Sequence, residues 1–130
     1  RLGDLRDLIA RRFDEGAVVA VGPDDTLMTA FQRMRLADVS QLPVLDKQQL
    51  LGVTDESDLL LTVHDDAARF HSPVSGAMTK KLDTVRPDAS IATLREILDR
   101  GLVAIIADDK QFYGLVTRFD LLNHLRKKLT

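Results

Sequence analysis

Two stretches of this sequence decide the fold: GVTDESDLL at residues 52–60 and GLVTRFDLL at residues 114–122. Each begins with a glycine followed by apolar residues, which is typical of a strand, and ends in the apolar spacing of a helix. An acidic residue stands near the start of both expected helices. The same local pattern therefore occurs twice in one chain, which indicates two copies of one structural unit.

A second pair of landmarks lies upstream of these stretches. PDDTL at residues 23–27 corresponds to PDASI at residues 87–91. The offset between copies is 64 residues at this landmark (87 − 23) and 62 at the other (114 − 52), which fits a small deletion in a loop. Because turn prolines, strand-end glycines and helix-start acids recur in the same order, the chain contains an internal repeat.

Hydrophobic periodicity predicts the elements around these landmarks. Expected strands lie at residues 17–21, 42–45, 50–53, 82–85, 102–107 and 112–116, and expected helices at residues 26–36, 56–63, 90–100 and 118–129. A helix is also predicted over residues 2–13, ended by Gly16. The polar stretch 64–76 is predicted to be a linker with a short helix.

A ββα unit has a sheet face that it cannot bury alone. We therefore expect an α+β fold in which two ββα repeats pack with pseudo-twofold symmetry, and the cleft between them is the natural place for a ligand. The predicted organisation is a lead-in helix at residues 1–15, a first repeat at 16–66, a linker at 67–77 and a second repeat at 78–130.

Composition narrows the class of protein. The 130 residues are 45% hydrophobic and 29% charged, which fits a soluble globular fold. A formal net charge of -2 argues against nucleic-acid binding. The absence of cysteine excludes disulfides and thiolate metal sites and fits a cytoplasmic location. The apolar stretches are too short to span a membrane. Because the chain starts at Arg1 rather than Met, we expect it to be a piece of a longer protein.

The ordered landmarks resemble the CBS domain, which is named after cystathionine β-synthase. The first copy has VGP at residues 21–23, LPVLD at 42–46 and the stretch at 52–60, and the second has VRP at 85–87 and the stretch at 114–122. The resemblance covers about residues 16–125. It implies a tandem CBS pair, or Bateman module, that binds a regulatory ligand and is not itself an enzyme.

A narrower resemblance concerns the two ends of the chain. GDLRDLI at residues 3–9 and TRFDLLNHL at residues 117–125 are similar to the C-terminal regulatory region of bacterial cystathionine β-synthase-type enzymes. This implies a pyridoxal-phosphate-dependent catalytic domain attached in the parent protein. The general resemblance to CBS pairs implies a homodimer formed through the CBS helices and an adenosyl ligand such as AMP, ATP or S-adenosylmethionine, with no intrinsic cofactor.

Thr117 and Asp120 form the sharpest candidate site. They stand where a strand ends and a helix begins, so free backbone N–H groups and the positive end of the helix dipole suit an anionic or polar ligand. A threonine hydroxyl can donate to a phosphate or ribose oxygen, and a carboxylate can accept from ribose hydroxyls. The resemblance implies that this pair holds the ribose of an adenosine ligand. The alternative is a plain helix N-cap, and the two roles are compatible.

The first copy departs from this pattern. Asp55 stands at the position of Thr117, and Asp58 at the position of Asp120. Two carboxylates would repel a phosphate, so the first cleft should be empty or take an uncharged or cationic adenosyl compound; the alternative is capping by an acid. The resemblance places the other wall of the clefts on strand residues, which could equally be ordinary core packing. These further candidate binding residues are Val39, Ser40, Gln41, Leu102, Val103 and Val116. Ala104 replaces the proline of the first copy, so the two clefts need not be equivalent.

Other kinds of site find little support in the sequence. The histidines are His64, His71 and His124, and none has a second histidine at metal-ligand spacing. The sequence HDD at residues 64–66 could hold a metal ion, but it is expected to be a solvated helix end instead. A structural or dimerisation module without a ligand is the main alternative function, through the helix faces near Leu59 and Leu121. The sequence contains no recognisable nucleophile–base motif, which argues against a free-standing enzyme.

Overall fold

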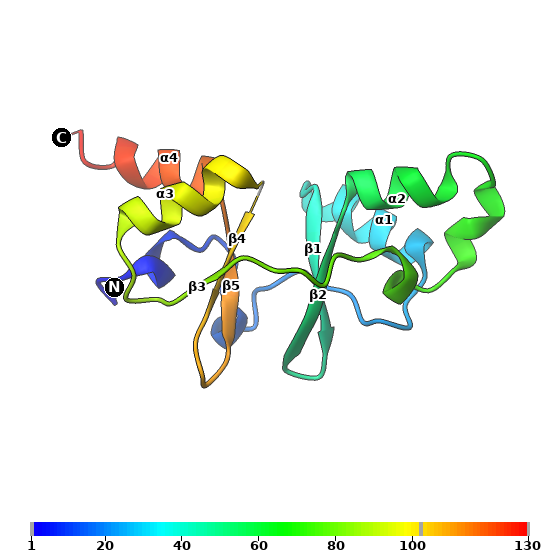
Figure 1. Ribbon diagram of the computed structural model, residues 1–130, viewed down its shortest axis with the longest axis horizontal. Coiled ribbons are helices and arrows are strands. Elements are labelled where there is room, and N and C mark those ends of the chain that lie inside the picture. The colour runs from blue at the N-terminus through cyan, green and yellow to red at the C-terminus, as the bar shows by residue number, and fades with distance from the viewer. Residues whose placement is uncertain (1, 102, 130) are drawn as a thin grey trace. The chain divides into compact units, whose positions relative to one another are not determined.

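The computed structural model describes residues 2–101 and 103–129. The chain forms two compact units, of which unit 1 comprises Arg1–Val18 and Asp83–Thr130 and unit 2 comprises Val19–Leu82. Within the described residues each unit has one small sheet and two α-helices (Figure 1). The fold is therefore mixed α+β, as the sequence predicted. Among the described residues, every helix is too short or too polar to cross a membrane.

Unit 2 is built on the antiparallel hairpin of β1 (Gln41–Asp46) and β2 (Gln49–Asp55). Helix α1 (Leu27–Ala37) precedes this hairpin, and α2 (Glu56–Val63) follows it directly. Both helices lie within a residue of their predicted bounds. The predicted strand over residues 17–21 is wrong in its length: only Val21 pairs, through a parallel bridge to Val44.

The predicted linker packs onto unit 2. It contains two short 3-10 helices, η3 (Ala67–His71) and η4 (Val74–Ala77). The Thr54 hydroxyl donates to the Ala77 carbonyl over 2.8 Å, and both residues are buried. The core of unit 2 consists of Val21, Leu27, Ala30, Met34, Leu42, Val44, Leu59, Val74 and Ala77. Residues after α2 therefore help to close the core of this unit.

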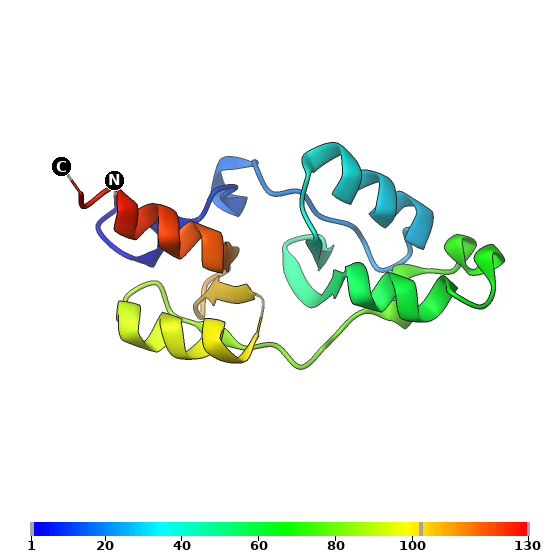
Figure 2. The ribbon, with the colours of Figure 1, turned by 90° about the horizontal axis from the view of Figure 1, so that it is seen from above.

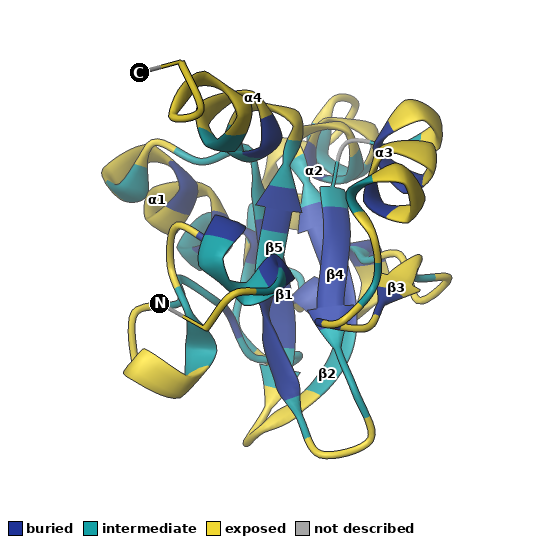
Figure 3. Ribbon diagram, turned by 90° about the vertical axis from the view of Figure 1, so that its left-hand side faces the viewer, coloured by how far each residue is buried: buried dark blue, intermediate teal, exposed yellow. Residues whose placement is uncertain are grey.

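Unit 1 has a three-stranded sheet in the order β3-β4-β5. Strand β3 (Thr84–Val85) is parallel to β4 (Val103–Ala107), which is antiparallel to β5 (Phe112–Thr117). Figure 3 shows β4 and β5 largely buried, with exposed residues on the outer faces of the helices. Leu102, predicted to begin the strand over residues 102–107, lies outside the described residues.

The helices of unit 1 are α3 (Ile91–Arg100) and α4 (Arg118–Arg126). Ser90 caps α3 by accepting a hydrogen bond from the Thr93 backbone N–H over 3.1 Å. Figure 2 shows α3 and α4 as one helix pair, and α1 and α2 as the corresponding pair of unit 2. The core of unit 1 consists of Leu5, Leu8, Ile9, Val85, Leu94, Ile97, Leu98, Ala104, Ile106, Tyr113, Val116 and Leu121.

The predicted lead-in helix over residues 2–13 is wrong. The segment forms two 3-10 helices, η1 (Leu5–Leu8) and η2 (Phe13–Glu15), with extended backbone at Ile9. Ile9 crosses Gly114 of β5 so closely that a Cβ on the glycine would lie 2.5 Å from Ile9 Cγ2. This contact with the strand replaces helix continuation, and the helix-like apolar spacing reflects burial in the core of unit 1. Gly16 does end η2, with a left-handed φ of 69°.

Candidate functional site

Thr117 and Asp120 form a reciprocal capping box at the start of α4. The Asp120 N–H donates to Thr117 Oγ1 over 3.2 Å, and the Thr117 N–H donates to Asp120 Oδ2 over 2.8 Å. The Thr117 hydroxyl also donates to Asp120 Oδ2 over 3.0 Å. The helix cap, which the sequence left as the alternative, is therefore present. Because these bonds to the carboxylate all use Oδ2, its Oδ1 is the oxygen that a ligand hydroxyl would reach.

Two strand residues lie beside this box in unit 1. Val103 stands opposite Thr117 in the β4–β5 ladder, and Ala104 stands opposite Val116. The Val116 side chain is fully buried in the core of unit 1, so it can offer a ligand only its backbone. Val103 is half-buried at the start of its strand. The end of the sheet thus presents an apolar side chain next to the polar pair.

The first copy builds the same box from two carboxylates. The Asp58 N–H donates to Asp55 Oδ1 over 2.9 Å, and the Asp55 N–H donates to Asp58 Oδ2 over 3.0 Å. Burial raises the pKa of the Asp58 carboxyl above its usual range, and the neighbouring Asp55 carboxyl raises it further, although the bond from the Asp55 N–H opposes this. The start of α2 therefore carries two carboxyl groups where the start of α4 carries one hydroxyl and one carboxyl group.

The remaining predicted residues of the first copy gather beside this acidic box. Gln41 stands opposite Asp55 in the β1–β2 ladder. The Ser40 carbonyl accepts from the Glu56 N–H over 3.1 Å, and the Ser40 hydroxyl donates to the Gln41 side chain over 2.8 Å. Val39 packs against the core of unit 2. The predicted site residues thus form two groups, one in each unit, at the same relative place on each copy.

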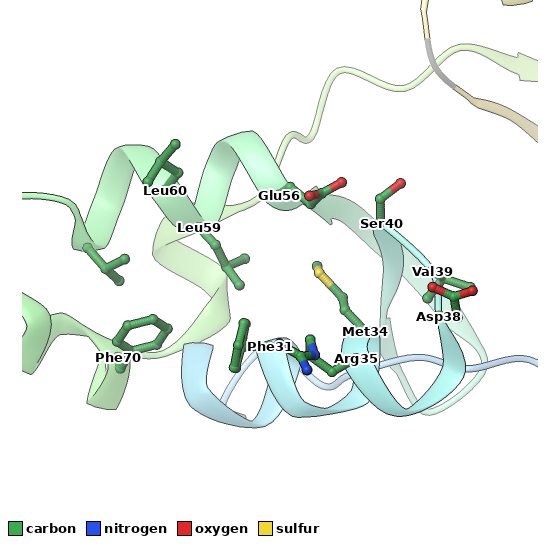
Figure 4. Close-up of a pocket in the computed structure, with 11 residues that line it drawn as sticks. Phe31, Met34, Arg35, Asp38, Val39, Ser40, Glu56, Leu59, Leu60 and Phe70 are labelled. Atoms are coloured by element: carbon green, nitrogen blue, oxygen red, sulfur yellow. The ribbon is translucent and has the colours of Figure 1, made fainter.

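Sequence reasoning missed a groove in unit 2. It has a volume of about 610 Å³ and lies between α1, α2 and η3 (Figure 4). Its lining residues are Phe31, Met34, Arg35, Asp38, Val39, Ser40, Glu56, Leu59, Leu60, Val63 and Phe70. The available signal was Phe70, a large apolar residue within an otherwise polar predicted linker. In the sequence, its partner in the groove, Phe31, could not be distinguished from the other residues on the apolar face of the predicted helix.

Within the part of the chain that the structure describes, no cluster of three or more His, Asp or Glu side chains could hold a metal ion. His64 ends α2 as its C-cap residue, and its backbone N–H donates to the Leu60 carbonyl over 3.0 Å.

The doubled unit with its paired capping boxes corresponds to a known domain family. The model of the CBS domain family matches residues 5–65 and 74–127, so the chain belongs to the CBS-domain family as a tandem pair. It is 27% identical over 107 residues to an inosine-5'-monophosphate dehydrogenase from Korarchaeum cryptofilum. That match covers 80% of this chain but only 21% of the enzyme, so the chain spans about a fifth of this curated relative.

Solved structures show the same fold. The CBS-domain containing protein ATU1752 from Agrobacterium tumefaciens superposes with a TM-score of 0.78 at 25% identity, covering 94% of this chain and 98% of that one. CBSX2, solved in complex with AMP, superposes with a TM-score of 0.81 at 20% identity, covering 98% of each chain. At these identities the likeness to CBSX2 concerns the fold alone.

Proposed function

We propose that this CBS pair is a regulatory module and that an adenosine-containing ligand binds in unit 1 at the start of α4. The observation that carries the proposal is the Thr117–Asp120 pair at a helix N-terminus, beside the apolar Val103. The similarly folded CBSX2 was solved with AMP, which supports a ligand of the adenosine type.

Each part of such a ligand has a matching group. Asp120 Oδ1 accepts from a ribose hydroxyl, while Oδ2 stays bonded to Thr117 and fixes the carboxylate. The positive end of the α4 dipole favours the phosphate. Val103 offers an apolar surface to the purine ring. Binding therefore requires no rearrangement of the capping box.

The acidic box of the first copy argues for one nucleotide per chain. Asp55 replaces the threonine hydroxyl, and Glu56 adds a third carboxylate next to Asp58 at the start of α2. A phosphate placed there would meet carboxylates in place of a hydroxyl donor. S-adenosylmethionine, which has a cationic sulfur and no phosphate, is the adenosyl ligand that this end of unit 2 would tolerate best.

The proposed role in a longer protein is control of an attached catalytic domain. The lead-in sequence predicts a pyridoxal-phosphate-dependent cystathionine β-synthase-type parent. The match to an inosine-5'-monophosphate dehydrogenase supports attachment to an enzyme in general and does not point to that type. We keep the regulatory role as the proposal, with a cytoplasmic location as the absence of cysteine predicts.

Dimerisation through the helices is a second candidate function, which is compatible with the first. Five large apolar side chains on α2 and α4 are exposed: Leu60 at 65%, Leu61 at 74%, Phe119 at 82%, Leu122 at 60% and Leu125 at 42%. Exposed apolar residues that gather on helices favour an interface with another chain. Sedimentation velocity tests this: a dimer that Leu122→Glu dissociates supports it, and a monomer at high concentration contradicts it.

Isothermal titration calorimetry tests the ligand directly. The folded chain is titrated with AMP, ADP, ATP and S-adenosylmethionine, with circular dichroism as the folding control. We expect at least one of the four to bind, and any phosphate-bearing ligand to bind with one site per chain. The absence of binding by all four to the folded chain would overturn the proposal.

A further inference from the structure

The groove of unit 2 has the size and lining of a small-molecule site. Its volume of about 610 Å³ lies within the range of about 300–1,000 Å³ that is usual for such sites. Most of the lining is apolar: Phe31, Met34, Val39, Leu59, Leu60, Val63 and Phe70. Met34 and Leu59 are buried, whereas Phe31 and Leu60 remain exposed. A molecule in the groove would therefore cover apolar surface that now faces solvent.

One end of the groove is aromatic. The rings of Phe31 on α1 and Phe70 on η3 meet edge to face, with their centroids 5.9 Å apart. Figure 4 shows both rings at the end of the groove that lies away from Ser40. The guanidinium of Arg35 lies over the Phe31 ring at 5.9 Å from its centroid. This end suits a flat ring or a branched aliphatic group.

The opposite end is acidic. Asp38, Ser40 and Glu56 line it, where α1 ends and α2 begins (Figure 4). The bond from the Glu56 N–H to the Ser40 carbonyl, 3.1 Å long, joins these two segments. The carbonyl end of the α1 dipole and the N-terminal end of the α2 dipole both lie here, and their partial charges oppose each other, so the carboxylates decide the sign. Two carboxylates against the single guanidinium of Arg35 leave the lining with a net negative charge, which favours a cation.

Unit 1 provides an internal comparison, because different residues stand at the corresponding positions of its helices. Arg118 occupies the position of Glu56, and its Nε donates to the Leu98 carbonyl over 2.9 Å, which ties α4 to α3. Arg95 and Asp99 replace Phe31 and Arg35 and form an ion pair of 3.8 Å.

Phe70 comes from η3, the short helix that follows α2. At the positions of Phe31 and Glu56, unit 1 has Arg95 and Arg118 instead. The aromatic and acidic ends of the groove come from residues that are particular to the first copy.

We propose that this groove is a second small-molecule site, which takes an amphipathic amine with an apolar or aromatic body. The body lies against Phe31 and Phe70, and the ammonium group lies beside Glu56. The site uses neither Thr117 nor Asp120, so it is separate from the adenosine site of unit 1 and goes beyond the proposed function, although it shares Val39, Ser40 and Glu56 with the acidic end of unit 2.

A matched set of probes tests the chemistry. Phenethylamine and 3-phenylpropionate have similar bodies and opposite charges, and each is titrated into the labelled chain while amide shifts are followed by NMR. We expect phenethylamine to shift the amides of α1, α2 and η3 and to bind at least about tenfold more tightly than the carboxylate, because the acidic end attracts only the cation. Equal binding of both probes, or shifts outside these elements only, would overturn the proposal.

Substitutions test the position of the site. Glu56→Arg introduces the residue type that stands at the equivalent position of unit 1, Arg118, and should weaken phenethylamine binding by at least about tenfold. Glu96→Arg makes the same charge change on the exposed face of α3 and should leave binding unchanged. Phe70→Ala removes the aromatic wall without altering charge and should also weaken binding, with the melting temperature as a folding check.

Two results would contradict the proposal. One is binding of phenethylamine that Glu56→Arg leaves unchanged. The other is failure of the folded chain to bind phenethylamine at all. If sedimentation then shows a dimer that Phe70→Ala dissociates, the occupant of the groove is a second copy of the chain, and the small-molecule proposal is likewise overturned. AMP titration of Glu56→Arg reports separately on the adenosine site of unit 1.

Discussion

Thr117 Oγ1 lies 3.0 Å from Asp120 Oδ2, so the two side chains of the proposed nucleotide site are hydrogen-bonded to each other across the first turn of α4. The bond holds the carboxylate in one orientation before any ligand arrives. A site that is preorganised in this way loses less conformational entropy on binding. Structural capping and ligand binding can therefore rest on the same pair of residues.

Asp120→Ala should lower the affinity for AMP by about 1.5–3 kcal/mol, the loss expected for hydrogen bonds to a charged group. It also removes the acceptor of the Thr117 N–H, so a modest fall in melting temperature is expected. Asp58→Ala, which breaks the equivalent box in unit 2, is the matched control. Calorimetry on both variants should show weaker AMP binding only for Asp120→Ala. An equal loss of AMP affinity in both variants would mean that the stability of the fold controls binding and that Asp120 does not contact AMP directly.

Asp55→Thr should lower the pKa of Asp58. Threonine can still cap α2, but it removes the neighbouring carboxyl. The pKa should stay above 3.8, because burial is the larger cause of its elevation. NMR titration of the Asp58 carboxyl carbon measures this, and an unchanged pKa would assign the whole effect to burial.

The same elevated pKa has a defined effect on stability. The folded chain binds the Asp58 proton more tightly than the unfolded chain does. The contribution of this group to the free energy of unfolding is therefore greatest below pH 3.8 and falls as the pH rises toward the folded pKa. In Asp55→Thr this fall should be smaller. Denaturant unfolding at a series of pH values measures this for both chains. The same pH dependence of the free energy of unfolding in both would mean that Asp55 does not affect the pKa of Asp58.

Gly114→Ala should destabilise unit 1 by about 1–3 kcal/mol, as is usual for overpacking. The new Cβ would approach Ile9 Cγ2 to 2.5 Å, at a residue whose φ is 155°. Gly76→Ala is the control, because nothing lies within 4 Å of its added Cβ. Denaturant unfolding should separate the two variants. Equal stability of both would contradict the close crossing of the lead-in segment over β5.

The helices and hairpins could be predicted from sequence because their signals are local. The apolar spacing and the acidic cap defined α2 at its observed bounds, Glu56–Val63. The lead-in segment could not be predicted in the same way. Its apolar residues have helical spacing, but the contact between Ile9 and Gly114 joins residues far apart in the chain and replaces helical structure.

The same contrast between local signals and long-range contacts applies to the candidate sites. The sequence identified both capping boxes, because each lies within four consecutive residues. It did not reveal the groove of unit 2, which depends on Phe70 folding back beside Phe31 from a segment predicted to be a linker. The copies also differ at Glu56 and Arg118, and the role of Arg118 could be seen only from its bond to the Leu98 carbonyl in the structure.

Amide shift mapping with AMP tests the central claim most directly. The labelled chain is titrated with AMP, and backbone amide shifts are recorded for both units in one experiment. The account predicts saturable shifts at Val103, Thr117 and Asp120, and no comparable shifts at Asp55 or Asp58. Shifts centred on Asp55 and Asp58, or none anywhere in the folded chain, would contradict it.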